Sequence, residues 1–299
     1  MLAVHIEGGR VRVRDIPVPA RPAGFALIRM LCAGICNTDL ELQRGYYGFA
    51  GTPGHEFVGE VVESDDPAWR GKRVVGEINL ACGRCEWCAR SLGRHCPNRT
   101  VLGIVKHPGA FAEYLTLPER NLHVAPESVS TERATFAEPV AAACEILEQV
   151  SIPGDEPVAV LGRGKLGLLI EQVLRASGKR VDPYGRADRK PPRSYQWVVE
   201  ATGSADGLRE ALAMTRPRGC IILKSTVHGD VPLDTAAAVV HEITLVGSRC
   251  GQFPPALDLL AQGAVDVETM IHARYRLSEA PAAFEHAGRK GALKVLLTP

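Results

Sequence analysis

The decapeptide VAVLGRGKLG, residues 158–167, constrains the fold of this chain more than any other stretch. A short apolar strand runs into three glycines spaced Gly162-x-Gly164-x-x-Gly167, and apolar residues at helical spacing follow in KLGLLIEQVLRASG. The glycines permit a tight turn and close approach of the backbone, and the start of the helix offers unpaired N–H groups to a pyrophosphate. The stretch therefore predicts the first β–α unit of a parallel sheet that binds a dinucleotide.

The rest of this loop and the segments after it agree with that prediction. Arg163 and Lys165 flank the middle glycine and add positive charge where phosphates would lie, and Leu166 completes the predicted cofactor loop. Further along, WVVEATG, CIILKST and ITLVGS are short, β-branched and closed by Gly or Ser, with the helix-like DGLREALAMT between the first two. We expect these segments to extend a doubly wound sheet.

Residues 1 to about 135 have a different hydrophobic pattern, with little sign of helices. Short β runs such as VRVRDI, FALIRML, FVGEVVES, KRVVGEI and AEYLTL are broken by Gly, Pro and Asn, which predicts an irregular all-β domain. The last thirty residues contain a predicted helix, SEAPAAFEHAG with Ser278 as its N-cap, and a terminal strand, ALKVLLT. Periodicity does not decide whether that strand joins the parallel sheet or returns to the first domain.

Composition excludes several classes of function. The 35 Lys and Arg residues nearly balance the 34 Asp and Glu residues, so the broad basic surface needed for non-specific nucleic-acid binding is not expected. The N-terminus has no apolar core of a signal peptide, and no window approaches the roughly 18 apolar residues of a membrane span. We expect a cytoplasmic protein with no membrane partner.

Cysteine usage indicates a metal. Of nine cysteines, four crowd into CGRCEWCARSLGRHC, with the spacing C-x2-C-x2-C-x7-C. These four are Cys82, Cys85, Cys88 and Cys96. Close spacing lets one loop wrap a tetrahedral zinc ion, and four thiolates leave no position for a substrate. The pattern predicts a structural zinc site, with an iron–sulfur site or free thiols as the alternatives.

A second constellation joins Cys36, in AGICNTD, to His55 and Glu56, in GHEFVGEV. A catalytic zinc keeps three protein ligands and one open position, and a thiolate, an imidazole and a carboxylate from separate loops can supply them. Each residue alone is ordinary, and a His beside a Glu is more often structural. Glu138 could offer another carboxylate, but spacing alone does not choose between them.

The order of AGICNTD, GHEFVGEV, the cysteine lobe, GAFAEYL and VLGRGKLG resembles the zinc-containing medium-chain dehydrogenase/reductase family over nearly the whole chain. The resemblance implies an α/β protein with a GroES-like, β-rich catalytic domain and a shortened, doubly wound Rossmann domain. The catalytic domain would comprise residues 1–139 and 270–299, and the cofactor domain residues 140–269.

The resemblance also implies roles for residues. Cys36, His55 and Glu56 match the ligands of the catalytic zinc, and Glu138 matches a carboxylate that approaches the metal or its water. Thr38 matches the hydroxyl that begins a proton relay from the substrate alcohol. Glu41 lies where sugar dehydrogenases of the family can carry Glu, which hints at a sugar or polyol substrate.

The function expected from the resemblance is hydride transfer between NADP(H) and an alcohol or carbonyl carbon, with two zinc ions per chain, one catalytic and one structural. One rival is an NAD-dependent threonine- or sorbitol-type dehydrogenase. The other is a non-catalytic, zinc-stabilised binding or structural protein on the same fold. Members of the family form dimers and tetramers, so we expect a homodimer or homotetramer.

The cofactor preference follows from the segment PYGRADRKPPRSYQW. An acidic residue after the second strand of the sheet would bind the ribose hydroxyls of NAD and repel the 2′-phosphate of NADP. Here Gly185 leaves room for a phosphate, while Arg186 can pair with it and Arg189 and Lys190 can close the other side. We predict NADP(H) as the preferred cofactor. NAD(H) stays possible, through Asp182, and a solvated basic turn is the alternative.

The same segment is too short for a complete Rossmann domain. A crossover with its helix needs about ten to twelve residues or more, and ten residues, two of them proline, separate Arg186 from Trp197. We therefore predict that the sheet is truncated after its second strand, with the strand before Gly185 at its edge.

Overall fold

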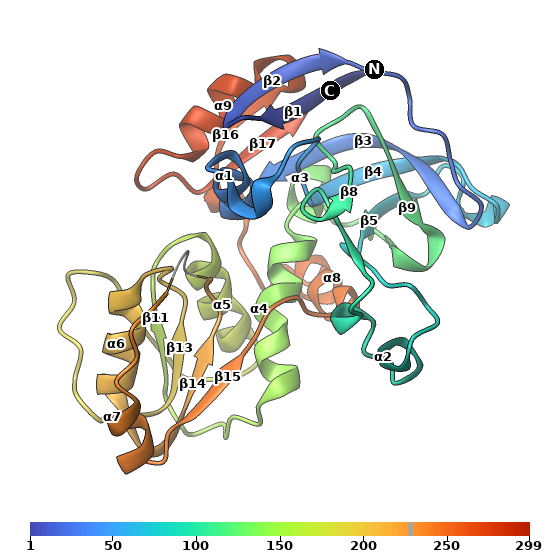
Figure 1. Cartoon of the computed structure of the whole chain (residues 1–299). Coiled ribbons are helices and arrows are strands. Elements are labelled where there is room, and N and C mark those ends of the chain that lie inside the picture. The colour runs from blue at the N-terminus through green and yellow to red at the C-terminus, as the bar shows by residue number, and fades with distance from the viewer. Residues whose placement is uncertain (227–229) are drawn as a thin grey trace. The chain divides into compact units, whose positions relative to one another are not determined.

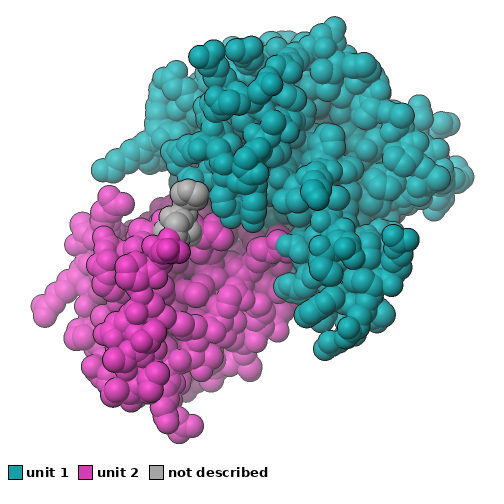
Figure 2. Space-filling view, in the orientation of Figure 1, with its two compact units in different colours: residues 1–138, 267–299 teal, residues 139–266 magenta. Residues whose placement is uncertain are grey.

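A computed structural model describes residues 1–226 and 230–299 of the chain. The chain forms two compact units, coloured separately in Figure 2: residues 1–138 with 267–299, and residues 139–266. Among the described residues, each helix is too short or too polar to cross a lipid bilayer.

The first unit is built on a seven-stranded sheet of order β10-β5-β4-β3-β17-β16, in which β9 also pairs with β3 (Figure 1). Its strands are β3 (Phe25–Ile35), β4 (Glu56–Glu63), β5 (Arg73–Gly76), β9 (Tyr114–Pro118), β10 (Leu122–Val124), β16 (Ile271–Arg276) and β17 (Lys294–Thr298). Apolar side chains of β3, β4 and β17 are fully buried and form much of this unit's core. The predicted β-rich first domain is confirmed.

Smaller elements complete the unit. The hairpin of β1 and β2 and a three-stranded sheet of β6, β7 and β8 lie outside the main sheet. The strands are β1 (Leu2–Glu7), β2 (Arg10–Asp15), β6 (Asn79–Leu80), β7 (Thr100–Leu102) and β8 (Lys106–His107). The helices are α1 (Asn37–Gln43), α2 (Glu86–Ala89), α3 (Thr131–Ala134) and α9 (Ala280–Ala287).

The C-terminal strand belongs to the first unit. β17 pairs antiparallel with β3 and parallel with β16, which answers the question that periodicity left open. The predicted N-cap of the last helix was wrong. Glu279 precedes α9, and Ser278 lies inside the 3-10 turn Leu277–Glu279, because the Glu279 carboxylate accepts the Arg276 N–H at 2.9 Å and closes that turn first.

The second unit holds a five-stranded, all-parallel sheet of order β12-β11-β13-β14-β15 (Figure 1). Its strands are β11 (Val158–Leu161), β12 (Val181–Tyr184), β13 (Tyr195–Glu200), β14 (Thr215–Leu223) and β15 (Thr244–Gly247). The helices are α4 (Ala137–Gln149), which begins just before the unit boundary, α5 (Lys165–Ala176), α6 (Ala205–Met214), α7 (Thr235–Val240) and α8 (Phe253–Ala261). The predicted fold class, a β-rich domain plus a shortened doubly wound domain, is confirmed.

The short connection between β12 and β13 leaves β12 at the edge of the sheet. Residues 185–194, all within the described part of the chain, form no helix or strand. Tyr195 begins β13 and packs with Val198, Ala211 and Ile221 in the core of this unit, and Tyr184 lies against the same cluster. The two tyrosine rings meet edge to face at 6.0 Å, with their hydroxyls 2.7 Å apart. Through this tyrosine pair, the edge strand β12 contacts the start of β13 despite the short connection between the two strands.

Candidate functional site

The four clustered cysteines converge as a metal-binding lobe requires. The sulfur of Cys85 lies 3.5 Å from that of Cys88 and 3.7 Å from that of Cys96, and the sulfurs of Cys82 and Cys88 are 3.9 Å apart. A tetrahedron of zinc–sulfur bonds of about 2.3 Å has edges of about 3.8 Å. The lobe therefore has the dimensions of a closed tetrathiolate zinc site without any rearrangement.

A local backbone group favours the thiolate form of Cys82, whereas, against the effect of the Cys88 N–H, burial and the neighbouring thiols raise the pKa of Cys85 to about 11. The N–H of Arg84 donates to Cys82 and lowers the pKa of that thiol to about 6, and the Cys82 N–H donates to Cys96 at 3.5 Å. Thiolates are the form that binds zinc, so N–H donors favour the ligating state. The four sulfurs and these donors fit a structural zinc.

The second cluster forms where the end of β3 lies beside the start of β4. Gly34 of β3 lies opposite Glu56 of β4 in the sheet register, Cys36 follows β3 by one residue, and His55 directly precedes β4. The potential ligand atoms of Cys36, His55 and Glu56 all lie within 4.8 Å of one another. A thiolate, an imidazole and a carboxylate at these distances can hold one zinc ion and leave a coordination position open.

Asp39, a residue not predicted from the sequence, orients the histidine. Its carboxylate is fully buried, accepts the N–H of Cys36 at 2.8 Å and that of Gly54 at 3.2 Å, and lies 3.5 Å from His55 Nδ1. Burial lowers the pKa of His55, but the Asp39 carboxylate and Cys36 outweigh it and raise the pKa well above its ordinary value. With Nδ1 turned to Asp39, Nε2 is the ring nitrogen left for a metal, as in carboxylate–histidine–zinc arrangements.

Lys294, also absent from the sequence-based predictions, is paired with Glu56. Its ammonium group donates to Glu56 Oε2, and both side chains are almost completely buried. The ammonium also lies 5.6 Å from the ring centre of Phe136. The signal in the sequence was a lysine inside the apolar strand ALKVLLT, because a charge is buried in such a strand only with a partner.

The other predicted catalytic residues divide into near and distant. Thr38 Oγ1 lies 3.8 Å from Cys36 Sγ. Burial raises the pKa of Glu138 to about 7, and the charges of His55, Glu56 and Lys294 have smaller effects on it. Glu138 is not one of the three converging ligands. The structure does not bring Glu41 into this group.

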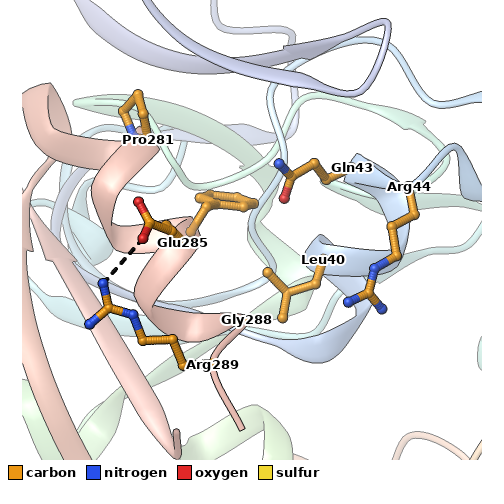
Figure 3. Close-up of a pocket in the computed structure, with 8 residues that line it drawn as sticks. Leu40, Gln43, Arg44, Pro281, Glu285, Gly288 and Arg289 are labelled. Carbon is orange, nitrogen blue, oxygen red and sulfur yellow. Dashed lines mark hydrogen bonds and ion pairs between the residues drawn. The ribbon is translucent and has the colours of Figure 1, made fainter.

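Glu41 instead pairs with Arg44 at 2.5 Å, at the side of a separate pocket. This pocket of about 320 Å³ lies between α1 and α9 in the first unit, as Figure 3 shows. Gln43 and Arg44 line one side and Glu285 and Arg289, themselves ion-paired at 3.2 Å, line the other. None of its eight lining residues belongs to the two groups of potential metal ligands found among the described residues.

The glycine loop connects β11 to α5, and its three glycines have different structural roles. Gly162 has a positive φ of 107°, and a Cβ there would lie 2.5 Å from the carbonyl oxygen of Ala201. A Cβ on Gly167 would lie 1.8 Å from the carbonyl oxygen of Gly162. Gly164 has open space on its Cβ side, beside the first N–H groups of α5. The outer glycines are required by packing, and the middle one leaves the approach that a pyrophosphate needs.

Gly185, the first of the predicted selector residues, follows β12 and lies beside the glycine loop. The N–H of Gly162 donates to the carbonyl of Tyr184 at 2.9 Å, which brings the glycine loop to Gly185. The Cδ atom of Arg163 lies 3.6 Å from where a Cβ on Gly185 would be, and the Gly185 N–H donates to the Asp188 carboxylate at 2.6 Å. Asp188 therefore occupies part of the space that the missing side chain leaves.

The remaining polar groups of this segment are placed as follows. Arg186 and Arg189 are exposed to solvent, and Lys190 pairs with Glu210 at 3.4 Å. Asp182 accepts a hydrogen bond from the Tyr195 hydroxyl at 2.8 Å. The two exposed arginines are thus free to approach a ligand, whereas Asp182 and Lys190 already have partners within the unit.

Comparison with known proteins agrees with this geometry. Residues 22–127 match the alcohol dehydrogenase GroES-like domain. The D-arabitol-phosphate dehydrogenase of Enterococcus avium is 27% identical, over 95% of this chain and 92% of its own length.

Two solved structures are similar over the whole fold. A zinc-binding dehydrogenase of Sinorhizobium meliloti 1021 with bound NADP is 27% identical with a TM-score of 0.89, covering 100% of this chain and 99% of its own. The alcohol dehydrogenase TADH of Thermus sp. ATN1 is 30% identical with a TM-score of 0.90, again covering 100% of this chain and 99% of its own. The chain therefore belongs to the zinc-type alcohol dehydrogenases of the medium-chain dehydrogenase/reductase family.

Proposed function

We propose that this enzyme uses zinc to transfer a hydride between NADP(H) and an alcohol or carbonyl carbon of a sugar or polyol. The observation that carries the proposal is the convergence of Cys36, His55 and Glu56 within 4.8 Å, with the hydroxyl of Thr38 3.8 Å from the cysteine sulfur. The first unit would be the catalytic domain and the second the cofactor domain. The D-arabitol-phosphate dehydrogenase among the relatives supports a polyol-type substrate.

The residues of the cluster divide the work of the reaction. A bound zinc ion would polarise the substrate oxygen, and bound nicotinamide would supply or accept the hydride. Cys36 and His55 would hold the metal, and Asp39 would keep the imidazole in place through its contact with Nδ1. We expect Thr38 to take the alcohol proton at its Oγ1 and pass it on. Burial raises the pKa of Glu138, whose carboxylate we expect to approach the metal or its water.

The preference for NADP(H) rests on the end of β12. Gly185 adds no side chain there, Arg163 lies beside it, and Arg186 and Arg189 are exposed and able to pair with a 2′-phosphate. The related S. meliloti dehydrogenase was solved with NADP. Asp188 opposes this preference, because its carboxylate on the Gly185 N–H must move before a phosphate approaches. Binding of NADH stays possible for the same reason.

Metal analysis and a substrate screen test the function together. The purified protein should contain about two zinc ions per chain, and Cys36→Ser should lose about one of them together with turnover. Reduction of NADP+ and NAD+ should be screened with sugars, polyols, their phosphates and simple alcohols. If the protein contains a single zinc ion and Cys36→Ser still contains it, the result would favour the non-catalytic rival. Clear preference for NAD+ over NADP+ would favour the threonine- or sorbitol-type rival.

We further propose a homodimer or homotetramer formed through the cofactor domain. β15 lies at one edge of the parallel sheet, and Leu245 on it and Val239 and Val240 on α7 are exposed apolar side chains. An open strand edge with apolar neighbours suits pairing with a second copy. Light scattering should find an oligomer that Leu245→Glu weakens. A monomer at working concentration would contradict the proposal.

A further inference from the structure

The short connection between β12 and β13, residues 185–194, is attached along the helix α6. The N–H groups of Arg193 and Ser194 donate at 2.8 Å to the carbonyls of Ala213 and Met214, which lie in the last turn of α6. The last carbonyls of a helix have no partner within the helix, so the connection satisfies two of them. Figure 1 draws this connection in yellow beside α6. The end of the connection is therefore fixed to the helix by its backbone.

Lys190 attaches the middle of the same connection. Its ammonium group lies 3.4 Å from the carboxylate of Glu210, on α6, and donates to the carbonyl of Arg186 at 3.0 Å. The side chain of Lys190 is 12% exposed and that of Glu210 is 41% exposed. A charge that is largely removed from water needs such partners. The lysine thus joins α6 directly to the backbone of Arg186.

The backbone around Arg186 is held from two sides, while its side chain is exposed to solvent. Before it, the N–H of Gly185 donates to the carboxylate of Asp188 at 2.6 Å. At Arg186 itself, the carbonyl accepts the hydrogen bond from Lys190. An arginine on a fixed backbone loses less conformational freedom when its guanidinium binds a ligand. The contacts of Lys190 therefore bear on how well Arg186 can bind a phosphate.

We propose that Lys190 is a positioning residue of the NADP(H) site, which together with Glu210 holds Arg186 where it can pair with the 2′-phosphate. The inference rests on the proposed preference for NADP(H). It replaces the role expected from the sequence, in which Lys190 would itself bind the phosphate. That role requires the ammonium to leave both Glu210 and the carbonyl of Arg186, whereas the positioning role uses the contacts as they stand.

Replacement of Glu210 separates the two roles by the sign of its effect. If Lys190 positions Arg186, Glu210→Gln releases the ammonium from α6 and weakens the binding of NADPH. If Lys190 binds the 2′-phosphate, Glu210→Gln frees the ammonium for the phosphate and removes a nearby negative charge, so NADPH binds more tightly. NADH, which lacks the 2′-phosphate, is the reference in both cases.

The test is calorimetric titration of the cofactor-free protein with NADPH and with NADH. We expect Glu210→Gln to raise the Kd for NADPH about 5-fold and that for NADH less than about 2-fold, as fits the loss of a partly exposed ion pair. Lys190→Met should have an effect of the same size. In that background, Glu210→Gln should change the Kd for NADPH less than about 2-fold further, because the pair is already broken.

Glu156→Gln is the matched control. It also removes one negative charge and one ion pair, with Arg216 at 2.8 Å, in the same unit but outside the connection. It should change neither Kd by more than about 2-fold. If Lys190→Met does not fold, Lys190→Gln takes its place, because its amide keeps a donor for the carbonyl of Arg186.

Three results overturn the inference. They are unchanged or tighter binding of NADPH by Glu210→Gln, equal losses for NADPH and NADH, and a full further loss when Glu210→Gln is added to Lys190→Met. Arg186→Ala tells this failure from a failure of the proposed preference. If Arg186→Ala weakens NADPH more than NADH and Glu210→Gln does not, the positioning role alone fails. If Arg186→Ala leaves the ratio of the two Kd values unchanged, the proposed NADP(H) preference fails, and the inference fails with it.

Discussion

Two single substitutions in the glycine loop are expected to act differently, one on cofactor binding and the other on folding stability. Gly164→Ala adds a methyl group into open space, whereas Gly167→Ala places it 1.8 Å from the carbonyl oxygen of Gly162. We expect the first variant to fold normally and to bind the cofactor weakly. The second should be destabilised whether or not a cofactor is present.

The magnitudes follow from the backbone. Gly164 has φ −86° and ψ −170°, which alanine adopts readily, so the lower entropy of the unfolded chain stabilises Gly164→Ala by about 0.4–1 kcal/mol. Alanine is a poorer N-cap than glycine for α5, by about 0.5–1 kcal/mol, so the net change in stability is within about 0.5 kcal/mol. In Gly167→Ala the methyl group meets the backbone carbonyl of Gly162, which cannot rotate away as a side chain could. The loss of folding stability should therefore lie near the upper end of overpacking effects, about 3 kcal/mol.

Urea unfolding of the cofactor-free protein and calorimetric titration with NADPH and NADH measure the two effects independently. Gly164→Ala should raise the Kd of both cofactors at least about 10-fold, equivalent to 1.4 kcal/mol, because the methyl group blocks the approach of the pyrophosphate shared by both. Gly154→Ala is the matched control, since residue 154 lies in the same unit and also has open space for a Cβ. Unchanged binding by Gly164→Ala would refute the assignment of this loop to the pyrophosphate.

Three further predictions concern other parts of the chain. Cys96→Ser should remove about one zinc equivalent and lower the melting temperature, measured by metal analysis and thermal unfolding. Arg186→Ala should raise the Kd for NADPH about 10-fold or more and that for NADH less than 2-fold, and equal losses in a titration would contradict its role as a selector. Lys224→Met should lower the free energy of unfolding in urea by about 1–3 kcal/mol, because the buried ammonium donates to the carbonyls of Ala142 at 2.6 Å and Arg249 at 2.9 Å.

The sequence was most informative where the chemistry is local. All four thiols of the cysteine cluster lie in the segment from Cys82 to Cys96, so one loop brings them together and their spacing alone predicts a metal site. The glycine loop is similar, because the strand, the turn and the helix that define it are consecutive. In both cases the residues that meet in space are neighbours along the chain.

The Cys36 cluster needed information that spacing does not carry. Cys36 and His55 meet because β3 and β4 pair with Gly34 opposite Glu56, a register that periodicity does not specify, and the family resemblance supplied it. No resemblance pointed to Lys294, which is 238 positions from Glu56 and reaches it through the pairing of β17 with β3. The N-cap of α9 was misplaced for a smaller reason: two neighbouring residues could close the turn, and the carboxylate did so.

The shortened sheet raises a physical problem that the edge strand itself addresses. The carbonyls of Arg180 and Tyr184 accept hydrogen bonds from β11, so alternate residues of β12 face that neighbour, and Val181 and Pro183 face the open edge. Pro183 has no N–H to offer there, and the carbonyl of Val181 accepts a hydrogen bond from Arg175 at 3.3 Å. An edge with these groups removed or occupied is a poor template for another strand. In the described part of the chain, the open edge of β12 therefore lacks one N–H, at Pro183, and has one occupied carbonyl, at Val181, which makes β15 the edge of this sheet better suited to a second copy of the chain.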